Sequence, residues 1–86
     1  MEINNLIKKI NDKICNNIKC ENILIEDKTF LHKKHKNFDP KKFHIKIRIE
    51  SLELKSKNKI EANRHVFNIL SQELKNYIHS IQLSIN

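Results

Sequence analysis

The stretch FHIKIRIE at residues 43–50 decides the fold, because apolar and polar side chains alternate along it without a break. A period of two is that of a β-strand, in which successive side chains point to opposite faces. One face of this strand is therefore expected to be apolar, and the other charged and exposed, with His44 among the exposed residues. The apolar set is Phe43, Ile45, Ile47 and Ile49, and the polar set is His44, Lys46, Arg48 and Glu50.

Upstream of this strand the sequence predicts a helix, a short strand and a loop. A helix is expected over residues 2–17, because its isoleucines recur every three or four positions. NILIED at 22–27 is rich in β-branched residues without helical spacing, which favours a strand. Lysines, histidines and the only proline gather at 29–42, which indicates a loop. The helix isoleucines are Ile3, Ile7, Ile10, Ile14 and Ile18.

Downstream, a turn, a second helix and a last strand are predicted. KSKNK at 55–59 is typical of a turn, in which Asn58 is expected to take a positive φ. Helical spacing then predicts a helix over residues 60–76, and the alternation of Ile81, Leu83 and Ile85 with polar residues predicts a strand. The apolar helix positions are Val66, Phe67, Ile69, Leu70, Leu74 and Tyr77.

The predicted order is therefore helix, strand, strand, helix, strand, in an α+β class. Each helix and each strand has one apolar face, so two helices are expected on one face of a three-stranded mixed sheet. No linker or repeat interrupts the order, and residues 1–86 are expected to form a single domain.

The composition favours an anionic partner. The net charge is +7, and 15 lysines attract phosphates or an acidic protein without selecting one. The chain also has 15 isoleucines, 12 asparagines and no glycine, which suggests a coding bias and lowers the weight of the lysine count.

Several function classes are disfavoured. No Ser-His-Asp or paired-carboxylate set is visible, and without glycine no phosphate-cradling loop is expected, so an enzyme is not predicted. No apolar run is long enough for a membrane span, and the start is too polar for a signal peptide. Cys15 and Cys20 suit a reducing compartment. The protein is expected to be intracellular, in the cytoplasm rather than an organelle.

The second half of the chain resembles the BolA family. Family motifs built around His-Phe-Lys-Val-Val, Gly-Lys, Arg-His-Arg, Leu-x-Glu-Glu-Leu and Ile-His-Ala-Leu align here without a gap over residues 43–85. The aligned stretches are HIKIRIES (44–51), SK (56–57), ANR (62–64), LSQEL (70–74) and IHSI (78–81). The first strand, with Asp27 and Thr29, is similar to the family's Asp-Glu-Ser. This resemblance implies the class II KH-like fold.

The resemblance also implies a function and a cofactor. BolA proteins pair with a monothiol glutaredoxin, and the two share a 2Fe-2S cluster that glutaredoxin and glutathione thiolates also hold. On this basis either His32 or His35 of the loop, together with His65, is expected to bind the cluster. Lys57, Asn63 and Arg64 are the expected contacts to glutaredoxin, and the protein alone is expected to be a monomer.

Two departures from the family pattern bear on these expectations. Asn63 stands in place of the histidine of Arg-His-Arg, so His65, two positions later, would take the ligand role only if the helix start is shifted. Ser56 stands in place of the family's turn glycine, so the backbone conformation that glycine adopts easily is expected to be less favourable there.

Nucleic-acid binding is the alternative function. Lys55, Lys57, Lys59 and Arg64 form a basic run at the predicted turn and helix start, and contacts from it to phosphates would be salt-sensitive. The absence of the Gly-x-x-Gly clamp of KH modules counts against specific binding.

The remaining cysteines and histidines have plainer interpretations. Cys15, Cys20, His32 and His35 come close to a zinc-finger spacing, but the histidine spacing is one residue short and no finger scaffold lies between them. His79 matches the histidine before the family's last strand, and it is expected to close the helix-to-strand turn through backbone hydrogen bonds.

Overall fold

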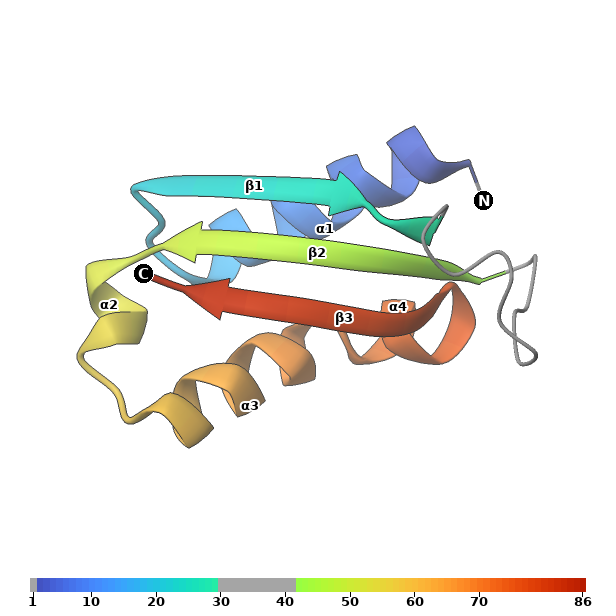
Figure 1. The fold of residues 1–86 in the computed structure, drawn as a ribbon. Helices are drawn as coiled ribbons and strands as arrows, with labels where there is room; N and C mark the ends of the chain where they lie inside the picture. The colour runs from blue at the N-terminus through green and yellow to red at the C-terminus, as the bar shows by residue number, and fades with distance from the viewer. Residues whose placement is uncertain (1, 30–41) are drawn as a thin grey trace.

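The computed structural model describes residues 2–29 and 42–86 (Figure 1). Within these ranges three strands form one sheet in the order β1-β2-β3, with β1 antiparallel and β3 parallel to β2. The α+β class and the mixed sheet are confirmed. The elements are α1 (Ile3–Asn17), β1 (Asn22–Asp27), β2 (Phe43–Glu50), α2 (Leu52–Lys55), α3 (Lys59–Ile69), α4 (Ser71–Asn76) and β3 (Ile78–Ile85).

The core lies between one face of the sheet and the helices. In Figure 1, α1 lies behind β1 and β2, while α3 and α4 run along β3. Ile45, Ile47 and Ile49 of β2 are buried against this layer, whereas Arg48 and Glu50 are exposed on the opposite face. The alternation in FHIKIRIE therefore has the predicted cause, because the isoleucine face of β2 packs against the core and the opposite face carries the exposed charges. The buried apolar residues from the helices include Leu6, Ile10, Ile14, Leu54, Ala62, Val66 and Leu70.

The buried stripe of α1 differs from the predicted one. Leu6, Ile10 and Ile14 are fully buried, whereas Ile3 and Ile7 are only partly buried. Positions four apart share a helix face, so Leu6 continues the line of Ile10 and Ile14 toward the helix start. The predicted stripe is confirmed at Ile10, Ile14 and Ile18, whereas near the helix start Leu6, which was not predicted, is buried more deeply than Ile3 and Ile7.

A short helix, α2, precedes the predicted turn at 55–59, and the helices on both sides of the turn have capping side chains. Ser51 begins α2, because its Oγ accepts a hydrogen bond from the Leu54 amide at 3.2 Å. Asn58 begins α3, because its Oδ1 accepts from the Glu61 amide at 2.8 Å. Asn58 has a φ of −67°, and no described residue has a positive φ, so the prediction for Asn58 was wrong. Ser56 is right-handed at φ −71°, and its backbone therefore has no need of glycine.

The predicted second helix is interrupted at Leu70. Leu70 has φ −97° and ψ 16°, which separates α3 from α4, although its carbonyl still accepts from the Leu74 amide at 2.9 Å. Leu70 is fully buried. Among the described residues no helix is both long enough and apolar enough to cross a bilayer.

A buried ion pair joins α1 to α4. The Glu73 side chain is fully buried, and both its carboxylate oxygens accept hydrogen bonds from Lys13 Nζ, at 2.9 and 2.8 Å. Lys9 Nζ lies 3.7 Å from the same carboxylate. A carboxylate without water needs such partners, because an unpaired buried charge is strongly destabilising.

Replacing Lys13 should test this pair. Lys13→Met leaves the Glu73 carboxylate buried with Lys9 alone, so we expect a loss of roughly 3 kcal/mol in unfolding free energy. Urea unfolding measures the loss. The matched control is Lys8→Met on the exposed side of α1, and equal losses in both variants would contradict a specific role for the pair.

Candidate functional site

At one end of the sheet, side chains at the end of β1 form hydrogen bonds that reach the backbone of β2. Asp27 Oδ1 accepts hydrogen bonds from the Thr29 amide, at 3.0 Å, and from the Thr29 hydroxyl. The Thr29 hydroxyl oxygen in turn accepts from the His44 amide at 3.2 Å, and the Lys28 amide donates to the His44 carbonyl at 2.8 Å. These hydrogen bonds connect the end of β1 to the start of β2. In the sequence, residues 30–41 lie between these two ends.

A β-bulge in β3 brings a second histidine to this end. Phe43 is opposite Ile78 and His44 is opposite Ser80, so His79 is the extra residue on β3. The His79 ring lies against the His44 ring, with centroids 4.8 Å apart and an interplanar angle of 48°. Bulges re-aim side chains and are common next to functional sites. We call His44 and His79 the histidine pair.

The two members of the histidine pair have different surroundings. His44 is only 6% exposed, and its Nδ1 lies 2.7 Å from Ser80 Oγ. His79 is exposed to solvent. The buried ring is therefore held in one orientation by Ser80 and by packing, and the exposed ring is available to a ligand or partner.

The predictions for both histidines were wrong in part. His44 is buried rather than exposed, and its ring contacts Ser80 and His79 of the neighbouring strand. His79 belongs to β3 rather than to the turn before it. The sequence held a signal for the bulge, because Ile78 and Ile81 are both apolar but are three residues apart. In a regular strand two residues at this spacing point to opposite faces, yet Ile78 is buried and Ile81 packs against the same core.

The predicted ligand His65 lies elsewhere. It is exposed on α3 and lines a shallow hollow with Lys57, Glu61, Arg64 and Asn68. The start of α3 lies beside Leu83, Ser84 and Ile85, at the end of β3 opposite the histidine pair (Figure 1). His32 and His35 lie outside the described residues, so their convergence with His65 stays a prediction.

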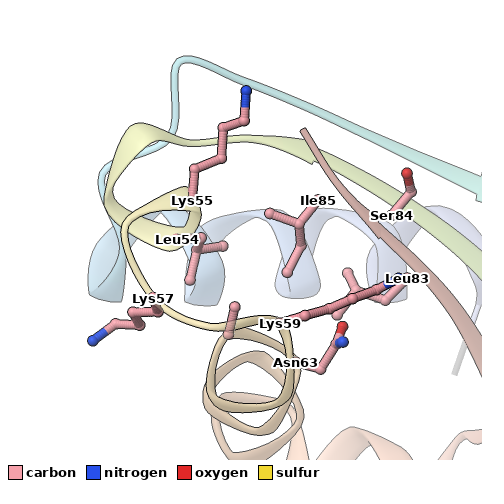
Figure 2. A pocket seen from close by; sticks show the side chains of 9 residues that line it. Leu54, Lys55, Lys57, Lys59, Asn63, Leu83, Ser84 and Ile85 are labelled. Carbon is pink, nitrogen blue, oxygen red and sulfur yellow. The ribbon is translucent and has the colours of Figure 1, made fainter.

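The predicted basic run divides between two surfaces. Lys55, Lys57 and Lys59 line a groove of about 400 Å³ between the α2–α3 turn and β3, and Asn63 lines it too (Figure 2). Arg64 does not line this groove and faces the hollow of His65, which Lys57 also borders. The predicted partner contacts Lys57, Asn63 and Arg64 therefore surround the start of α3 on two sides.

Comparison with known proteins gives the family. The model of the family described as BolA-like protein matches residues 14–86. The chain belongs to the BolA-like family. None of the curated proteins matches it significantly.

Solved BolA structures share the fold. The BolA domain of SufE1 from Arabidopsis thaliana superposes with a TM-score of 0.78 at 23% identity, over 92% of this chain and 87% of that one. BolA1 from Arabidopsis thaliana gives a TM-score of 0.76 at 20% identity, with the same coverage of both chains. The BolA-like family is not a known enzyme family.

The cysteines of this BolA-like chain do not form part of a metal cluster in the described ranges. Cys15 and Cys20 are free thiols, and no group of three or more His, Cys, Asp or Glu side chains within residues 2–29 and 42–86 is placed to hold a metal ion. The pKa of Cys20 is raised to about 11, mainly by burial and in part by the neighbouring Cys15 and the negative charges of Glu21 and Glu53.

The two thiols should therefore differ in reactivity. The thiolate is the nucleophile, so at about pH 8 we expect iodoacetamide to alkylate exposed Cys15 well before Cys20. Peptide mass spectrometry over a time course measures the two rates. In guanidinium the two rates should become similar, and equal rates in the native protein would show that Cys20 is not protected.

Proposed function

We propose that this BolA-like chain is an adaptor that binds a monothiol glutaredoxin and takes part in the assembly, trafficking or iron-dependent regulation of 2Fe-2S clusters. Family membership over residues 14–86 supports the class of protein. The observation that carries the proposal is an exposed imidazole, His79, packed against a buried one at the end of the sheet.

The exposed imidazole of His79 suits a cluster shared with a second protein better than a metal site built within this chain alone. Glutaredoxin and glutathione would supply thiolates, so this chain needs to contribute only one or two nitrogen ligands. Imidazole in place of thiolate raises the reduction potential of a 2Fe-2S cluster. Such a cluster is cargo passed between proteins, and exposure of the donor is a requirement for that exchange.

His79 fits this role better than His44. Its ring is exposed, whereas the His44 ring is buried with Nδ1 beside Ser80 Oγ. Packing of His44 against His79 limits the orientations of the exposed ring, as the neighbours of metal-binding histidines commonly do. His32 and His35 belong to the segment that joins the sheet at this same end, so either could supply the second ligand.

The contact surface for glutaredoxin would also use the start of α3. Arg64 is exposed there, and Lys57 and Asn63 lie beside it. A net charge of +7 favours encounter with an acidic surface.

Nucleic-acid binding is the second candidate, and one observation favours it. Lys55, Lys57 and Lys59 come from the α2–α3 turn and its flanks and border one groove. Phosphate contacts there would weaken steeply with salt. This surface lies at the other end of the sheet from the histidine pair, but it shares Lys57 with the proposed glutaredoxin contact.

Cluster sharing can be tested by reconstitution. A monothiol glutaredoxin loaded with a 2Fe-2S cluster and glutathione is mixed with the protein, and visible circular dichroism and complex size are followed. We expect a mixed complex with a changed spectrum. His79→Ala should abolish the spectral change, because the exposed imidazole is lost, and Arg64→Ala should weaken the complex.

The controls separate the two candidate ligands. His65→Ala and Gln82→Ala should retain the spectral change, since His65 is exposed on α3 and Gln82 is an exposed residue of β3 without an imidazole. Loss of the change in His65→Ala, but not in His79→Ala, would return the ligand role to His65. No complex at all, with strongly salt-dependent affinity for a nucleic acid, would favour the second candidate.

A further inference from the structure

The groove between the α2–α3 turn and β3 has an apolar floor. Leu54 and Ala62 are buried at its base, and Leu83 and Ile85 of β3 are partly buried along its side. In Figure 2 the side chains of Leu54, Leu83 and Ile85 converge on a common space. Nine residues line the groove: Leu54, Lys55, Lys57, Lys59, Ala62, Asn63, Leu83, Ser84 and Ile85.

The rim of the groove is cationic. Three lysines line the groove. In Figure 2 Lys59 extends toward Leu83, whereas the side chains of Lys55 and Lys57 extend outward, away from the space between Leu54, Leu83 and Ile85. Among the described residues that line the groove, none carries a carboxylate. Glu61, in the first turn of α3, faces the hollow of His65 instead.

The position of Lys59 is unfavourable for the helix itself. It is the first residue of α3, where the positive end of the helix dipole disfavours a cation. Its charge adds to the dipole, so the local field favours an anion, and Asn63 offers an amide inside the same space.

We propose that this groove binds a small organic anion in which a carboxylate, sulfonate or phosphate head is joined to an apolar body. The volume of about 400 Å³ lies within the range of small-molecule sites. Lys59 would contact the head, Asn63 the polar edge, and the floor of Leu54, Leu83 and Ile85 the body. This site is separate from the histidine pair, which lies at the other end of the sheet, but it shares Lys57 and Asn63 with the proposed glutaredoxin contact.

Two dyes with the same apolar body test both halves of the proposal. Anilinonaphthalene sulfonate carries an anionic head, whereas phenylnaphthylamine has the same rings without it. We expect the sulfonate to bind at one site, and the neutral dye to bind about tenfold more weakly, because it lacks the charge-assisted contact. Inorganic sulfate alone should compete poorly, since it cannot use the floor.

Paired variants of equal net charge separate the groove from the general field of the protein. Asn63→Glu places a carboxylate in the groove and should weaken sulfonate binding about tenfold, whereas Asn68→Glu on the other side of α3 should not. Lys59→Gln should weaken binding about threefold, and the control Lys75→Gln on α4 should leave it unchanged. Circular dichroism verifies that each variant is folded.

Methyl resonances locate the dye. On titration the signals of Leu83 and Ile85 should shift, and that of Leu24, which is 49% exposed on β1, should not. Equal binding of the two dyes, or equal weakening in both members of a pair, would overturn the proposal. Binding of a single-stranded oligonucleotide at the groove that the sulfonate does not compete with would also overturn the proposal.

Discussion

Strand β2 pairs with both other strands along its length, and this double pairing places every other element. The antiparallel partner β1 needs only a return of the chain, but the parallel partner β3 needs a crossover from the end of β2 back to its start. The helices α2, α3 and α4 make that crossover on the face where the isoleucines of β2 are buried. The crossover also assigns the two surfaces of interest to opposite ends of the sheet, because β3 begins at the histidine pair and finishes at the lysine-lined groove.

Much of this architecture could be predicted from local periodicity. The alternation in FHIKIRIE and the β-branched run at 22–27 predict both strands with the observed bounds. Each pattern arises within one strand that faces the core, so no knowledge of the neighbouring strands is needed. The caps also had local signals that were misread. Asn58 is followed three residues later by Glu61, a pattern of helix starts, and the prediction treated it as a turn residue instead.

The candidate site was harder to predict because it depends on neighbours from separate parts of the chain. His44 has the pattern of a polar-face residue in its own strand, but it is buried, and its contacts Ser80 and His79 are more than thirty residues away. The position of His79 depends on a register shift between β2 and β3. In the sequence this shift is indicated by the three-residue spacing of Ile78 and Ile81. The role of His65 was inferred from distance along the chain to the family motif, and its exposure on α3 neither supports nor opposes convergence with His32 or His35, which lie outside the described residues.

The register shift in β3 has a consequence for the variation that this family member can tolerate. A residue at a bulge takes no regular part in the ladder, so the hydrogen bonds on either side do not depend on which side chain it carries. Mutational drift at position 79 would therefore leave the sheet intact while altering whatever chemistry occurs at its end. A scaffold with this property can change the exposed side chain at the end of its sheet in one substitution without first losing its fold.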